Sequence, residues 1–148
     1  MGKNNISVTN PCQKVEKMRG LTRENSDIIS FVTKSLSYLA INRAEVREWA
    51  IKMVAENDIN ELPNYLIDLM DFNDESPDLF KMIGFVPVWK HNKDQLKALY
   101  GIAIKRGKSL SDIDITANEA LTALEKHSEI EERFRNTFPF IKFYPPYF

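Results

Sequence analysis

The sequence has very few of the residues that build covalent or metal-bound sites. Its 148 residues include one cysteine, Cys12, and two histidines, His91 and His127, which lie far apart along the chain. Structural zinc needs cysteine or histidine ligands at short, regular spacings, and no such cluster occurs. A single cysteine cannot form a disulfide within the chain, which is typical of proteins from a reducing cytoplasm. We therefore expect no metal and no bound cofactor.

Glycine and long apolar runs are also scarce. The five glycines form neither a glycine-rich phosphate loop nor a nucleophile elbow, so the sequence carries no catalytic signature. No run of about 18 apolar residues occurs that would span a membrane. Residues 1–10 are polar and lack the apolar core of a secretory signal. These absences favour a cytoplasmic protein without enzymatic activity.

The charges of the chain are balanced in number but separated along the sequence. Twenty basic and 21 acidic residues give a formal net charge of −1, which argues against a general nucleic-acid binder. The stretch from Glu56 to Asp78 nevertheless holds eight acids and no lysine or arginine. The stretch from Lys81 to Lys108 then holds seven bases and one acid, Asp94. Each stretch is a candidate binding surface.

Apolar residues recur at spacings of three and four over most of the chain, which predicts amphipathic helices. The pattern predicts helices over about 23–40 and 43–56, the second started by a capping box of Asn42 and Glu45. Residues 85–89 predict an extended connector or edge strand, and 109–115 a loop or brief strand. Further helix starts are expected at Asp58 or Pro63, at Ser76–Pro77–Asp78, at Asn92, at Thr116 and at Ser128.

The two ends of the chain differ from the middle. Residues 1–20 predict a surface tail or a short docking helix. The last fifteen residues contain seven aromatic side chains and three prolines, which forbid a continuous helix. We expect residues 137–148 to pack over the helices as an extended strap, with an exposed partner-binding strip as the alternative. The sequence therefore predicts an all-α, single-domain bundle of six or seven short helices over 21–148.

Helix starts explain only some of the acids between Glu56 and Asp78. Asp58, Glu61 and Asp78 fall in predicted caps or first turns, where anions are favoured. The others could simply keep the surface soluble, or they could form a docking surface for a basic partner. We expect Phe72 and Trp89 to serve that surface as apolar anchors. The acids left without a local structural role are Glu56, Asp68, Asp71, Asp74 and Glu75.

A small helical chain without catalytic motifs and with this acidic segment (Asp68, Asp71, Asp74, Glu75 and Asp78) resembles the bacterial immunity proteins. Such proteins neutralise the toxin of a contact-dependent inhibition system or a related polymorphic-toxin system. The resemblance implies a cytoplasmic protein that binds a basic toxin domain, often a nuclease. It assigns no role to any particular residue.

Two other classes of function remain open from the sequence. Lys90, Lys93 and Lys97 are spaced three and four apart, and the surrounding segment includes aromatic residues. Lysines attract phosphates and aromatic rings can stack on bases, so a helical nucleic-acid-binding module is the alternative. An enzyme whose site is assembled across several helices would leave no local motif.

Overall fold

The computed structural model describes residues 17–110 and 112–142. In these residues the chain forms seven α-helices and one 3-10 turn, with no β-strand. The prediction of an all-α chain of short helices is confirmed, and no described helix is long and apolar enough to cross a membrane. The elements are α1 (Asp27–Ser37), α2 (Arg43–Glu56), η1 (Ile59–Glu61), α3 (Tyr65–Leu69), α4 (Leu79–Ile83), α5 (Lys93–Lys105), α6 (Ala117–Lys126) and α7 (Ser128–Thr137).

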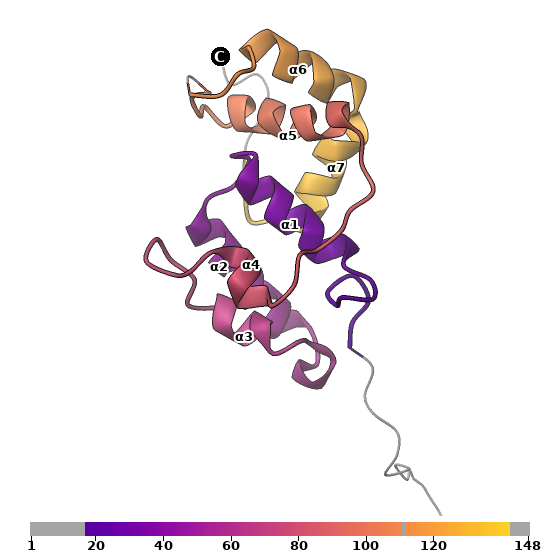
Figure 1. Cartoon of the computed structure of the whole chain (residues 1–148), viewed down its shortest axis with the longest axis vertical. Coiled ribbons are helices and arrows are strands. Elements are labelled where there is room, and N and C mark those ends of the chain that lie inside the picture. The colour runs from indigo at the N-terminus through magenta and orange to yellow at the C-terminus, as the bar shows by residue number, and fades with distance from the viewer. Residues whose placement is uncertain (1–16, 111, 143–148) are drawn as a thin grey trace, which may run out of the picture.

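Helix α1 lies in the centre of the molecule (Figure 1). Helices α5 and α6 pack on one side of it as an antiparallel pair, and α2, α3 and α4 lie on the other side. Helix α7 packs against α5 and α6. Its buried Phe134 belongs to the same hydrophobic core as the buried apolar residues of α1. From Ile29 to Ser35, every residue of α1 except Lys34 is buried. The central helix is therefore covered on nearly all sides.

Several helix ends follow the sequence closely. Helix α2 spans the predicted residues, and its capping box is formed as expected, with both hydrogen bonds between Asn42 and Glu45 at 2.9 Å. Asn92 and Gln95 form the same arrangement at the start of α5. Gly84, with a φ of 91°, ends α4 in the left-handed conformation that glycine adopts easily. Residues 85–89 form the predicted connector, without a strand.

Other helix starts differ from the prediction. Helix α1 begins at Asp27 rather than near residue 23, because its first turn is capped by a backbone group from an earlier loop. The carbonyl of Gly20 accepts hydrogen bonds of 2.9 Å from the amides of both Ile28 and Ile29. Helix α4 is capped by Asp78 rather than Ser76, and Ser128 is the first residue of α7 rather than its cap.

An ion pair joins the two sides of the molecule. It links the end of α5 to the first turn of α2. Arg106, which follows α5, binds the carboxylate of Glu45 in the first turn of α2 through both terminal nitrogens. It also donates a 2.6 Å hydrogen bond to the carbonyl of Ala40 between α1 and α2. Burial acts to raise the pKa of Glu45, but the hydrogen bonds and positive charge of Arg106 outweigh it and hold this pKa below its usual value.

The described part of the aromatic C-terminal segment packs onto the core. Phe138 is fully buried, and its ring centroid lies 5.0 Å from that of Phe134 and 6.3 Å from that of Phe31. Ile141 is also buried. The remainder of the predicted strap, 143–148, lies outside the described residues, as does 1–16 of the predicted N-terminal tail. Residues 17–20 end in a turn rather than a helix.

Replacing Gly20 by alanine should destabilise the fold strongly. Gly20 has a φ of 95°, and an added Cβ would lie 2.5 Å from Cγ1 of Ile28. Gly107 is the matched control, with a φ of 79° and no atom within 4 Å of an added Cβ. Alanine at this position would strain the backbone without a steric clash. We expect Gly20→Ala to lower the free energy of unfolding by about 1–3 kcal/mol more than Gly107→Ala, as measured by urea denaturation. Equal losses would show that the contact with Ile28 relaxes freely.

Replacing Ser35 by alanine should stabilise the protein. The buried hydroxyl of Ser35 has no hydrogen-bond partner in the described part of the chain, whereas that of Ser30 donates to the carbonyl of Asp27 at 2.9 Å. Both serines lie within α1, so alanine changes the helix propensity equally at the two positions. We expect Ser35→Ala to be more stable than Ser30→Ala by about 1 kcal/mol in thermal unfolding. The reverse order would mean that the Ser35 hydroxyl has a partner in solution.

Candidate functional site

Four of the predicted acids are exposed and lie within eight residues of one another along the chain. Asp68 lies on α3, and Asp71, Asp74 and Glu75 lie in the segment that connects α3 to α4. All four are exposed, and none forms an ion pair within the described part of the chain. We call these four residues the acidic surface.

The local sequence explains why these carboxylates face solvent. Leu66 and Leu69 are fully buried and fix the orientation of α3, which turns Asp68 outward. Phe72, which follows Asp71 directly, is also fully buried, so the chain returns to the core at this residue. The predicted common exposure of Asp68 and Asp71 is therefore observed.

The connection between α3 and α4 is held in place by arginines of α2. Arg43 donates from Nη1 to the carbonyls of Asn73 and Ser76, at 3.0 and 2.9 Å. Its guanidinium carbon also lies 4.8 Å from the centroid of the Phe72 ring. Arg47 donates to the carbonyl of Phe72 at 3.3 Å. These bonds go to the backbone, so they order the segment and leave its carboxylates free.

The segment is ordered from within as well. Asn73 accepts a 2.8 Å hydrogen bond from the amide of Glu75 and donates one of 2.9 Å to the carbonyl of Asp71. The hydroxyl of Ser76 accepts from the amide of Asn73 at 3.0 Å. The role of these arginines could not be predicted from the sequence. Arg43 and Arg47 precede the acidic stretch, and they contact it only because α3 packs on α2.

The predicted apolar anchors are wrong for an exposed interface. Phe72 is fully buried and Trp89 is only 7% exposed, so both are core residues. The ring of Trp89 packs edge-on against Phe31, with centroids 5.4 Å apart. The exposed apolar residue next to the acids is instead Ile67, which is 43% exposed. The sequence contained a signal for this exposure, because Ile67 is next to Asp68 and four residues before Asp71, a spacing that puts two residues on the same face of a helix.

Glu56 does not join the other predicted acids. It ends α2 and pairs with Lys52 at 2.7 Å. Arg43, which contacts the acidic segment, lies at the opposite end of the same helix. With a rise of about 1.5 Å per residue, the two ends of α2 are about 20 Å apart. Glu56 is therefore separated from the acidic surface.

The predicted basic stripe is interrupted by acids. Lys97 pairs with Glu119 of α6 at 3.6 Å, and Asp94, one turn earlier on α5, pairs with Lys126 at 3.4 Å. Lys90 and Lys93 are exposed. The aromatic residues of this region are largely occupied within the protein, since Trp89 is buried and Tyr100 packs on Tyr38 with ring centroids 4.8 Å apart. The stripe offers few of the stacking surfaces that single-stranded nucleic acids use.

The described residues contain no cluster of three or more histidine, cysteine, aspartate or glutamate side chains arranged to hold a metal ion. His127 contacts two carboxylates, at 3.2 Å from Glu129 and 3.9 Å from Asp94, in the joint between α6 and α7. His91 lies beside Trp89, with ring centroids 5.1 Å apart. Within residues 17–110 and 112–142, neither histidine makes a hydrogen bond or ion pair with a serine, threonine or cysteine of the kind that covalent catalysis uses.

Comparison with models of known protein families, with curated proteins and with solved structures finds no match to this chain.

Replacing Arg43 by alanine should loosen the acidic segment selectively. The change removes two hydrogen bonds to backbone carbonyls and the contact with the Phe72 ring. We expect amide hydrogen exchange in residues 72–76 to speed up about tenfold, with α5 and α6 little affected. Arg19→Ala is the control, because Arg19 is exposed and makes no hydrogen bond in the described part. Unchanged exchange in residues 72–76 would show that Arg43 does not hold the segment.

Proposed function

We propose that the chain is an immunity-type protein that binds and neutralises a basic toxin domain, such as a nuclease, through the acidic surface. The observation that carries the proposal is the set of four exposed carboxylates without ion pairs in the described residues, three of them on a segment that two arginines hold in place. A site whose shape exists before binding loses less conformational entropy when a partner docks. Complementary charge speeds association and rejects partners of the wrong sign.

The composition of the surface supports a protein partner. Ile67 places an exposed aliphatic side chain among the carboxylates, which gives the surface an apolar contact as well as charge. Protein interfaces commonly combine an apolar centre with a polar rim. A nuclease presents cations where it normally receives phosphates, and carboxylates at similar spacing can occupy such a site.

Reversing the charge of the acidic surface should abolish this binding. We expect the triple variant Asp68→Lys, Asp71→Lys and Asp74→Lys to lose at least about a hundredfold in affinity for the basic toxin domain. Pull-down and titration calorimetry would measure the loss, and survival of toxin-expressing cells would report protection. None of the three side chains makes a hydrogen bond or an ion pair in the described part of the chain, so the variant should fold.

A second triple variant controls for the change in total charge. Asp112, Asp114 and Glu125 are also exposed and without ion pairs in the described residues, but they lie near or on α6. Changing these three to lysine should leave toxin affinity within about twofold, because separated surface charges are screened by salt. Full protection by the Asp68, Asp71 and Asp74 variant, or equal losses in both variants, would refute the acidic surface as the binding site.

A further inference from the structure

The connector between α4 and α5 exposes two aliphatic side chains that the proposed function does not use. Val86 and Val88 are 70% and 71% exposed, which makes them the most exposed large apolar residues in the described part of the chain. Between them Pro87 is buried, and Trp89 follows in the core. The connector therefore alternates between residues that face the core and residues that face solvent. We call Val86 and Val88 the valine ridge.

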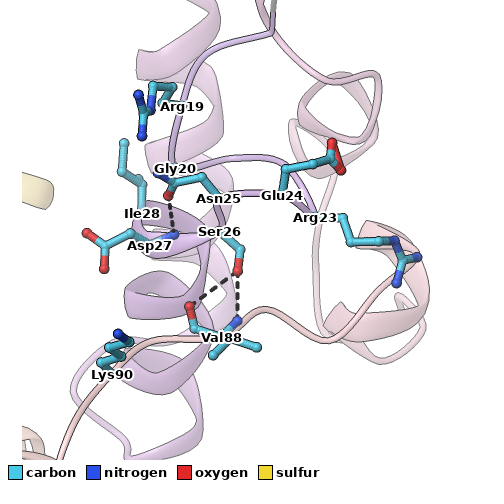
Figure 2. Close-up of a pocket in the computed structure, with 10 residues that line it drawn as sticks. All are labelled: Arg19, Gly20, Arg23, Glu24, Asn25, Ser26, Asp27, Ile28, Val88 and Lys90. Carbon is cyan, nitrogen blue, oxygen red and sulfur yellow. Dashed lines mark hydrogen bonds between the residues drawn. The ribbon is translucent and has the colours of Figure 1, made fainter.

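The valine ridge is fixed in position by contacts with the core and with the residues just before α1. The hydroxyl of Ser26 accepts a 2.8 Å hydrogen bond from the amide of Val88 and donates one of 3.3 Å to its carbonyl (Figure 2). Arg23 donates to the carbonyl of Gly84 at the start of the connector. Valine also has few side-chain rotamers. A partner that covers the ridge would lose little entropy in ordering it.

The surroundings of the valine ridge are positively charged. Val88 borders an open hollow of about 560 Å³ whose lining includes Arg19, Arg23 and Lys90. These three residues form no ion pair in the described part of the chain. Of the two acids in the lining, Asp27 is neutralised by Arg133 at 3.1 Å, and only Glu24 is unpaired there. The region around the ridge thus carries an excess of positive charge.

The cations are spread along the connector rather than aimed at one point. Figure 2 shows Arg23 and Lys90 on opposite sides of Val88. The spacing suits a chain that carries several negative charges. An aliphatic ridge without a fully exposed aromatic ring favours a peptide over a single-stranded nucleic acid, which binds by stacking.

The geometry points to the valine ridge and its flanking cations as a docking site for an extended acidic peptide segment of another protein. Aliphatic side chains of the peptide cover Val86 and Val88, and its carboxylates reach Arg19, Arg23 and Lys90. This partner has the opposite charge to the toxin domain proposed above. The two sites are therefore independent, and either one can fail without the other.

The test uses the full-length protein and short labelled peptides composed of glutamate and leucine. Fluorescence anisotropy should show binding of this peptide, and at least about tenfold weaker binding when glutamine replaces glutamate. A peptide with lysine in place of glutamate should not bind at the ridge. A short oligothymidylate is included as a nucleic-acid probe. Amide NMR shifts caused by the glutamate peptide should appear in residues 19–27 and 84–91.

Matched variants locate the site. Val86→Ser with Val88→Ser should weaken peptide binding about tenfold or more, while Ile59→Ser, at a residue 54% exposed on η1, should not. Lys90→Gln should weaken binding about threefold, while Lys126→Gln on α6 should not. The ridge variants change exposed side chains only, so they should fold.

Three results would overturn the inference. The first is absence of peptide binding at millimolar concentration, and the second is binding that the ridge variants leave unchanged. The third is tighter binding of the oligothymidylate than of the peptide, which would assign the cations to nucleic acid. Because the acidic surface is intact in every ridge variant, toxin binding by these variants separates a failure here from a failure of the proposed function.

Discussion

The burial of α1 is the constraint on which the rest of the structure depends. A helix surrounded on nearly all sides needs two groups of helices to cover it, and the chain supplies α2–α4 on one side and α5–α7 on the other. The two groups must then be held in register, which the contact of Arg106 with Glu45 and Ala40 achieves. Because Glu45 also completes the capping box of α2, one carboxylate serves a local and a long-range role.

Features that depend on neighbouring residues could be predicted from the sequence. The boxes at Asn42 and Asn92, the stop at Gly84 and the exposure of Asp68 and Asp71 all follow from spacings of a few residues. The start of α1 could not be predicted in this way, because the acceptor for its first amides is the carbonyl of Gly20, in a loop before the helix. An amphipathic pattern also gives no warning that Ser30 and Thr33, on the polar face of α1, are buried too.

The candidate surfaces also combine features that could be predicted from neighbouring residues with features that depend on the fold. The acidic stretch was visible in the sequence, but its support by Arg43 and Arg47 and the separation of Glu56 required the fold. Aromatic residues were misleading, because Phe72 and Trp89 are used for the core, and smaller aliphatic residues occupy the surface instead. In a small protein that buries its rings, the exposed apolar contacts come from residues such as Ile67, Val86 and Val88.

Arg133 connects the end of the described chain to its beginning. From α7 it bonds to the carbonyl and carboxylate of Asp27, at 2.9 and 3.1 Å, and lies over the rings of Phe31 and Trp89. The contacts with Asp27 and Phe31 span more than one hundred residues of sequence. During synthesis, α1 is thus enclosed late, since α7 must leave the ribosome before Arg133 can contact α1. Until then the apolar face of α1 lacks this cover, and apolar surface exposed during folding favours aggregation.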